Sequence, residues 1–569
     1  MADFRKWIPV LAVGVLVMGA ATANADTFQC SANAGVTPLV RAEGIAELAG
    51  DLLLNCSGTV PTGGITSNIR IFANTTVTSK LAASSNTLPQ ASEALLLLND
   101  PAAASQVYRA ASSIDNSANP NVFQGTTYST NVVDWYSIPI AAAGSAGLDV
   151  TKTIRITNIR VNAAQLGVSS TLVPQPIQLS LSISGGTSVG INNPTQTVAW
   201  VQKGLTFSAS GGATSFKSCE ATASGEPIIV AFTEGFASAF KAAGDTSQQT
   251  PGASYNTEGG MVPAGNTALG VATQGSRLLA QFNNVPTGIT LTAQGTYTDA
   301  TTGLTIKSVS GADTSGAGGT VSGADQAVTT GGTVVFVWEV TAAPTDSIGS
   351  NEVVSLEVTP SWTSRPDATS GDGITVQGNY APISTVTTAS YSAPVPRFQD
   401  TSSATTGGSI TIEACRTVLL FPYVTNASGF DTGIAISNTS ADPFETAAQS
   451  GTCALNYYGN IASTGGEAPD AVTTPEVEAG EQLAFIVSSG GSVVGTDKSC
   501  TACATPGFHG YVIAVCNFQY AHGFAFVSDL GSANLAEGYL ALVIPDKSSR
   551  DAQAFSLSAA GNDGEQLVH

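Results

Sequence analysis

The feature that most constrains this chain is an unbroken alternation of apolar and polar residues at Ile177–Ser184. Successive side chains of a β-strand point to opposite faces, so this period places all four aliphatic residues on one face of a sheet. The pattern recurs at Ile154–Thr157 and Ile289–Thr292, and β-branched runs occur at Val334–Val340 and Val353–Val358. Such runs, bounded by turn residues, are typical of strands. The sequence therefore predicts an all-β protein.

Helical signals are few. Phe232, Phe236 and Phe240 are spaced one helical turn apart, which predicts a short helix at Phe232–Lys241. The stretch Ser308–Gly332 is small and polar and is predicted to be a long loop or mobile linker. The predicted architecture is several β-sandwich domains of immunoglobulin-like shape in series, with one or two short helices.

The N-terminus has the order of a secretory signal peptide. Arg5 and Lys6 precede the apolar run Trp7–Ala20, and Ala23-Asn24-Ala25 supplies small residues before a cleavage point. The apolar run is short for a membrane-spanning helix, which is the alternative interpretation. We expect residues 1–25 to be removed, no transmembrane span after them, and an extracellular, cell-surface or periplasmic location.

Composition limits the partners. Of 569 residues, 43% are hydrophobic and only 11% are charged, and the net charge is −21. An acidic surface repels phosphate backbones, which excludes nucleic acid as an expected partner. Lys is the residue that most often blunts exposed strand edges, and its scarcity favours association with the chain itself or with other cell-surface components.

Composition shifts divide the mature chain into three regions and a tail. The expected boundaries are an N-terminal β domain at 26–207, a middle Gly- and Thr-rich β domain at 208–414 and a C-terminal β domain at 415–546. Residues 547–569 form a polar tail that we expect to be disordered.

The eight cysteines are the disulfide candidates, because an even number in an exported chain favours disulfides. We expect pairing of Cys30 with Cys56, of Cys453 with Cys516 across a sandwich core, and of Cys500 with Cys503, which leaves Cys219 and Cys415 to flank the middle region. The alternative is a zinc site in the C-terminal region. It would use Cys500, Cys503, His509, Cys516 and His522.

No catalytic residue is assigned. The segment Gly186–Gly190 matches a nucleophile elbow, but the turn Ile191–Pro194 follows where that motif needs a helix. His522 lies near Ser528 and Asp529. Its expected role is a strand histidine packed on an aromatic face formed by Phe518, Tyr520, Phe524 and Phe526.

Binding motifs are equally sparse. The Asp-Gly pair in Gly371–Gly373 predicts a tight hairpin rather than a calcium loop. Trp135-Tyr136 and Tyr457-Tyr458 are candidate platforms for sugar rings, although large aromatics in strands more often pack in the core. We expect no cofactor and no metal.

Several segments together resemble a group of large, uncharacterised exported proteins from environmental bacteria. The resemblance spans most of the mature chain and implies export and a shared architecture, with no activity and no functional residues attached. The segments that carry it are Val40–Gly44, Leu52–Cys56, Phe232–Phe236, Leu419–Asn426, Gly429–Asn438 and Asn517–Phe526.

These observations predict a secreted or cell-surface structural or adhesive protein that self-associates into a matrix, fibre or layer. The alternative is a secreted carbohydrate-binding protein or hydrolase whose site is assembled from distant loops.

Overall fold

The computed structural model describes residues 27–83, 90–168, 173–210, 215–217, 227–251, 255–344, 351–362, 373–401, 406–413, 415–444, 446, 448–461, 465–529 and 534–544. These ranges exclude the predicted signal peptide, the polar tail, Cys219 and Asp372 of the predicted hairpin, whereas Gly373 is described. The helical segments described are three-residue 3-10 turns at Ala103–Ser105, Ala143–Ser145, Ala163–Gln165 and Thr501–Cys503. Among the described residues, no helix has the length and apolar character needed to cross a bilayer.

The first body is a sheet that folds back around one core. Its strands follow the order β13-β1-β4-β10-β6-β8-β9-β5-β12-β14-β2, and β7 pairs with β8, while β3 and β11 form a separate ribbon. The strands are β1 (Gln29–Ala34), β2 (Leu39–Arg41), β3 (Glu47–Leu48), β4 (Leu52–Thr59), β5 (Ile65–Ala73), β6 (Gln90–Leu98), β7 (Tyr108–Arg109), β8 (Val122–Ser129), β9 (Val132–Ala141), β10 (Asp149–Thr157), β11 (Arg160–Val161), β12 (Gln175–Gly185), β13 (Gly190–Asn192) and β14 (Thr195–Gln202).

The second body is a sandwich of two sheets, ordered β15-β17-β25-β19-β23 and β16-β27-β26-β18-β24-β21-β20, with β22 beside β21. The strands are β15 (Leu205–Ser210), β16 (Ser215–Lys217), β17 (Ile228–Glu234), β18 (Arg277–Val285), β19 (Thr290–Ala293), β20 (Thr296–Thr298), β21 (Thr305–Ala312), β22 (Gly318–Val321), β23 (Gln326–Thr329), β24 (Gly332–Ala342), β25 (Val353–Ser361), β26 (Ile374–Ala381) and β27 (Thr406–Glu413).

The third body is a sandwich of two six-stranded sheets, ordered β31-β30-β36-β28-β39 with β32 beside β30, and β35-β34-β33-β29-β37-β38. The strands are β28 (Thr417–Thr425), β29 (Asp431–Asn438), β30 (Cys453–Ile461), β31 (Gly466–Glu467), β32 (Val472–Thr473), β33 (Gln482–Ile486), β34 (Gly490–Val493), β35 (Ser499–Cys500), β36 (Phe508–Cys516), β37 (Ala521–Ser528), β38 (Ala536–Leu540) and β39 (Leu542–Val543).

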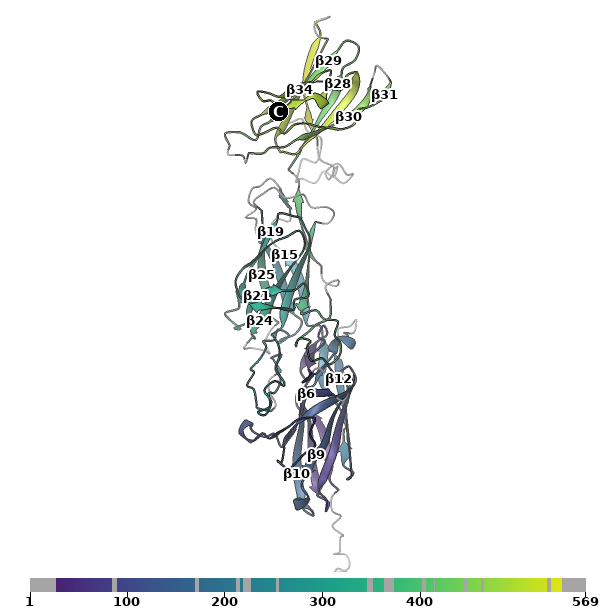
Figure 1. Ribbon diagram of the computed structural model, residues 1–569, viewed down its shortest axis with the longest axis vertical. Coiled ribbons are helices and arrows are strands. Elements are labelled where there is room, and N and C mark those ends of the chain that lie inside the picture. Colours follow the sequence, from purple (N-terminus) through teal and green to yellow (C-terminus); the bar gives the residue numbers. More distant parts are fainter. Residues whose placement is uncertain are drawn as a thin grey trace, which may run out of the picture.

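Each body has its own hydrophobic core. The three main cores draw on residues from Phe28 to Val201, from Leu205 to Ile412 and from Leu419 to Ala541. Figure 1 shows the bodies in chain order along the longest axis of the molecule. The predicted all-β class and the serial sandwiches are confirmed. In β12, Ile177, Leu179 and Leu181 are buried while the intervening Gln178 is exposed, as the period of two requires.

Two sequence predictions are wrong. The helix predicted at Phe232–Lys241 is the end of β17 followed by a turn. Its phenylalanine spacing is also compatible with a strand, because positions four apart share a face at a period of two, and Phe232 is buried with Val230 and Ile228. The β-branched residues upstream favour the strand.

The stretch 308–332, predicted to be a loop, instead contains the end of β21 and all of β22 and β23. Thr supplies the β-branched side chains that suit short strands. Glycines turn the chain between them: Gly316 and Gly323 have φ of 80° and 73°, a left-handed conformation that glycine adopts without steric penalty. The low hydrophobicity of this stretch therefore reflects short exposed strands and not a long loop.

Candidate functional site

The outer surface of one C-terminal sheet is an unusual apolar surface. We call it the apolar face and define it by Gly433 and Ala435 on β29, Ala484 and Ile486 on β33, and Phe524 and Phe526 on β37. Two rows cross the sheet: Ile486, Gly433 and Phe526 are in register in one, and Ala484, Ala435 and Phe524 are in register in the other. Because all six occupy alternate positions of three adjacent strands, they share one side of the sheet.

The sequence of β37 explains why phenylalanines face outward. Its inward positions carry Ala521, Gly523 and Ala525, and its outward positions carry His522, Phe524 and Phe526. A Cβ at Gly523 would lie 2.6 Å from Cζ of Phe421, which projects from the opposing sheet. The Phe421 ring therefore fills the space that a larger inward side chain of β37 would need. Phe524 and Phe526 remain 43% and 46% exposed.

The shape of the apolar face combines a ridge with a trough. Phe524 leans over β38, since a Cβ added at Gly538 would be 2.7 Å from Cζ of the ring. Small residues on β29 and β34 floor a shallow depression of about 430 Å³ beside the phenylalanines. The described residues that line it are all uncharged. Polar side chains border the apolar face on one side. There, Gln482 Nε2 donates to Ser437 Oγ at 2.8 Å, and Ser437 is in register with His522. A flat or complementary apolar partner can therefore dock here without desolvating a lining charge.

A second feature is a buried polar network between the first two bodies. Nη1 and Nη2 of Arg41 donate to Oε1 and Oε2 of Glu258 at 2.8 and 3.0 Å, and Nε donates to Glu47 Oε1 at 2.8 Å. The Arg41 guanidinium also lies 4.7 Å from the ring centroid of Phe398 and 5.4 Å from that of Tyr380. The side chains of Arg41, Glu47 and Glu258 are at most 2% exposed. The network therefore joins residues of the first body to the middle region in a water-poor environment.

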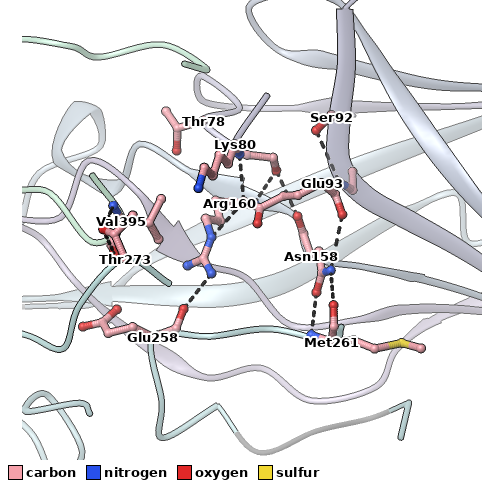
Figure 2. Close-up of polar contacts among 12 residues, drawn as sticks. Thr78, Lys80, Ser92, Glu93, Asn158, Arg160, Glu258, Met261, Thr273 and Val395 are labelled. Atoms are coloured by element: carbon pink, nitrogen blue, oxygen red, sulfur yellow. Dashed lines mark hydrogen bonds and ion pairs between the residues drawn. The ribbon is translucent and has the colours of Figure 1, made fainter. Parts of the chain in front are cut away.

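Figure 2 shows how this network continues around Arg160 and Asn158. Nη2 of Arg160 donates to the backbone oxygen of Glu258 at 2.6 Å, and its Nε donates to Glu93 Oε1 at 3.0 Å. Asn158 exchanges two hydrogen bonds with Met261: its Nδ2 donates to the Met261 oxygen at 2.7 Å, and the Met261 nitrogen donates to its Oδ1 at 2.8 Å. The guanidinium of Arg160 and the side-chain amide of Asn158 thereby both hold the backbone at residues 258–261.

The charges of this network depend on each other. Burial by itself raises the pKa of Glu258, but the charge of Arg41 lowers it below its ordinary value. Burial likewise opposes the charge on Arg41, and Glu258 and Glu47 raise the pKa of Arg41 above its ordinary value. Lys241, which is buried nearby, has its pKa lowered by burial. The pairing of Arg41 and Glu258 keeps both side chains ionised inside the protein.

The structure contains three disulfides among the described cysteines. They join Cys30 to Cys56, Cys453 to Cys516 and Cys500 to Cys503. Cys453 and Cys516 lie directly opposite each other on β30 and β36, so the bond joins neighbours in one sheet and does not cross the core as predicted. Cys415 is also disulfide-bonded. Because Cys219 lies outside the described residues, its pairing with Cys415 stays a prediction.

The structure also places the candidate aromatic pairs and the segment that matches a nucleophile elbow. Trp135 is buried in the first core, and Tyr457 is buried whereas Tyr458 is 44% exposed. Tyr458 stacks on Tyr511, with ring centroids 5.0 Å apart. Gly186–Val189 form a turn that leads into β13 and not into a helix.

His522 is a strand residue on β37 and shares a face with Phe524 and Phe526, as predicted. The predicted packing is wrong, because this face is exposed and Phe518, which is buried, does not belong to it. Cys516 is buried in a disulfide, so it does not share a surface with His522. In the part of the chain that the structure describes, no cluster of three or more His, Cys, Asp or Glu side chains is arranged to hold a metal ion.

Sequence reasoning missed both the apolar face and the buried network. The alternation of small and large residues in Ala521–Phe526 was available as a signal for the face, since it pairs phenylalanine with glycine and alanine. The network has no local signal, because Arg41 and Glu258 are 217 positions apart.

Comparisons with known proteins identify no family. No family model matches the chain, and no curated protein matches it. The solved structures that align with it include the full-length RrgB pilus protein of Streptococcus pneumoniae, at 8% identity and a TM-score of 0.16, over 95% of this chain and 73% of that one. A serine-rich repeat adhesion glycoprotein, Srr1, of Streptococcus agalactiae aligns at 9% identity and a TM-score of 0.17, over 67% of this chain and 97% of that one. Similarity this low carries no argument about function.

Proposed function

We propose that this chain is an exported structural or adhesive protein of the cell surface. Its first two bodies act as a stiff spacer, and its C-terminal sandwich presents the apolar face. The observation that carries the proposal is the buried ion pair between Arg41 and Glu258. The three disulfides support it, because such bonds persist in oxidising compartments outside the cytosol.

Stiffness follows from the energetics of the buried network. Interfaces between domains of one chain are ordinarily small and polar, and the domains move relative to each other. Here a rotation at the junction would separate Arg41 from Glu258 and leave buried charges without partners. Breaking a buried pair in this way costs about 3–5 kcal/mol. A backbone hydrogen bond also joins the two bodies, since the Ile45 nitrogen donates to the Arg397 oxygen at 2.9 Å.

The test combines shape and location. Small-angle scattering of the mature chain should give one rigid elongated particle for the first two bodies, and immunogold labelling of native cells should place the protein in a surface layer or in fibres. A freely diffusing pool inside the cell, or an ensemble of bent junctions in scattering, contradicts the proposal.

The second candidate is a secreted carbohydrate-binding protein or hydrolase. The stacked pair Tyr458 and Tyr511 favours it, because both rings are more than two-fifths exposed and Asn460 and His509 lie beside them in register. Aromatic rings with nearby polar groups suit sugar recognition. A glycan array with wild type and Tyr511→Ser tests this candidate; specific binding that is lost in the variant favours it over the structural role.

A further inference from the structure

We infer that the apolar face binds the same face of a second copy of this chain around a two-fold axis. The inference rests on the proposed function and assigns a surface to its self-association. It commits to a second copy as the occupant, on grounds of shape, charge and area.

Shape is the first ground. In a two-fold interface, each contact occurs twice, so one surface must carry both halves of the fit. The apolar face does so: Phe524 and Phe526 form a ridge on β37, and Gly433 and Ala435 on the adjacent β29 form part of a trough. A two-fold axis between β37 and β29 places the ridge of each copy in the trough of the other.

The trough has room for this contact. A Cβ built at Gly433 has the Phe526 backbone oxygen as its nearest neighbour, at 3.9 Å. Among the described residues, no other atom lies within 4 Å of this Cβ, so a ring from a second copy can occupy the space above Gly433. Ile486, which is 45% exposed, forms the far wall of the trough.

Charge is the second ground. Two copies of a chain with a net charge of −21 repel each other over most of their surface. The described residues that line the depression are uncharged, so the repulsion between copies is smallest where these faces meet. Salt screens the remaining repulsion, and the association should strengthen as ionic strength rises.

Area sets the strength. Leu540 on β38 is in register with Phe524 and extends the apolar face at its edge. Phe524, Phe526, Ile486 and Leu540 are between 43% and 49% exposed. With about 200 Å² for each such residue, they offer roughly 350 Å² of apolar surface, within the range of functional patches on monomers. A symmetric contact then buries about 700 Å² from these residues, below the ~1,000 Å² that a stable interface should exceed. The dimer should therefore be weak and form only at high protein concentration.

Two variants with opposite chemistry test the inference. Phe526→Ser removes part of the ridge, and Gly433→Val fills the trough while adding apolar surface. Tyr511→Ser is the matched control, because it removes a ring that is 41% exposed on the opposite sheet of the same sandwich. The mature chain and each variant are compared by sedimentation velocity over a range of about 1–300 µM, and circular dichroism verifies that each is folded.

Wild type should dimerise, and both Phe526→Ser and Gly433→Val should raise the dissociation constant at least tenfold, with no change in Tyr511→Ser. A monomeric wild type over the whole range overturns the inference. So does tighter association of Gly433→Val, which would mean non-specific apolar adhesion or another occupant, and so does equal weakening by Tyr511→Ser. A monomer that immunogold still places in a surface layer would refute this interface alone and leave the proposed function intact.

Discussion

Arg41 and Glu258 form a bidentate ion pair with N–O distances of 2.8 and 3.0 Å, although 217 positions separate them in the chain. Arg41 ends β2 of the first body, and Glu258 lies between β17 and β18 of the second. The pair is closed on all sides by protein, so its geometry reports directly on how the two bodies are joined.

Replacing Glu258 should destabilise both bodies together. Glu258→Gln keeps the shape of the side chain but loses the charge opposite Arg41, and we expect the free energy of unfolding to fall by about 3 kcal/mol. Four of the five tryptophans lie between residues 135 and 362, and the fifth is in the predicted signal peptide. Tryptophan fluorescence of the mature chain in urea therefore follows the first two bodies alone.

The control for this prediction is Glu357→Gln, which makes the same chemical change at an exposed position of β25 in the second body, where tryptophan fluorescence reports on it. Interactions of exposed charges contribute below about 1 kcal/mol, so this variant should unfold like wild type. Equal effects of the two variants would show that the junction does not depend on the buried charge.

Glu234 predicts a dependence of stability on pH. Its Oε1 accepts from the Phe240 nitrogen at 2.6 Å and its Oε2 from the Glu352 nitrogen at 3.1 Å. Burial nevertheless raises the pKa of Glu234 to about 7 from an ordinary 4.5, and the charge of Glu352 adds to the rise. The folded state then holds a proton that the unfolded state releases. The contribution of Glu234 to the free energy of unfolding should be largest below about pH 4.5, fall by about 3 kcal/mol toward pH 7 and level off above it.

The measurement is urea unfolding by tryptophan fluorescence at several pH values, for wild type and Glu234→Gln. The slope between about pH 5 and 7 should be smaller in the variant. Some slope of the same sign should remain, because burial also raises the pKa of Glu43. An unchanged slope would mean that Glu234 does not titrate in this range.

Disulfide removal should affect the C-terminal sandwich according to loop length. Cys453 and Cys516 are separated by 63 positions, and Cys500 and Cys503 by 3. The entropy of the closed loops corresponds to about 4 and about 2 kcal/mol. The double variant Cys453→Ala/Cys516→Ala should lower the melting temperature of the C-terminal transition in calorimetry more than Cys500→Ala/Cys503→Ala does. The reverse order would contradict the loop-length account.

The strands could be predicted from the sequence because period-two patterning is local. Alternation identified β12 at 177–184 and the β-branched runs identified β24 and β25. Parity also placed His522, Phe524 and Phe526 together, but it does not say which side of a sheet is buried. That choice depends on Phe421, which comes from the opposing sheet and occupies the space next to Gly523.

Tertiary packing also decides what local spacing leaves ambiguous. Phe232 and Phe240 have helical spacing, yet both are buried in a core that β17 enters as a strand. The junction between the first two bodies could not be predicted from the sequence. Arg41, Arg160 and Glu258 come from separate parts of the chain, and no pattern in one part indicates the others.

The last prediction concerns a close contact inside the second body. A Cβ built at Gly378 on β26 would overlap the ring of Phe207, which is 5% exposed and lies on β15 of the facing sheet. Gly378 has a φ outside the left-handed region, so strain in the backbone does not enter. Gly378→Ala must therefore displace the Phe207 ring and its neighbour Phe232, whose ring centroid is 5.1 Å away. Overpacking of this kind costs about 1–3 kcal/mol.

Gly186→Ala is the matched control, because no atom of the described residues lies within 4 Å of the added Cβ. Urea unfolding followed by tryptophan fluorescence should show a lower midpoint for Gly378→Ala. The midpoint of Gly186→Ala should equal that of wild type. The variant Gly378→Ala/Phe207→Leu, in which the smaller side chain makes room for the added methyl group, should recover part of the loss. If the double variant is less stable than the sum of the two single effects, the contact between the two sheets is not the cause.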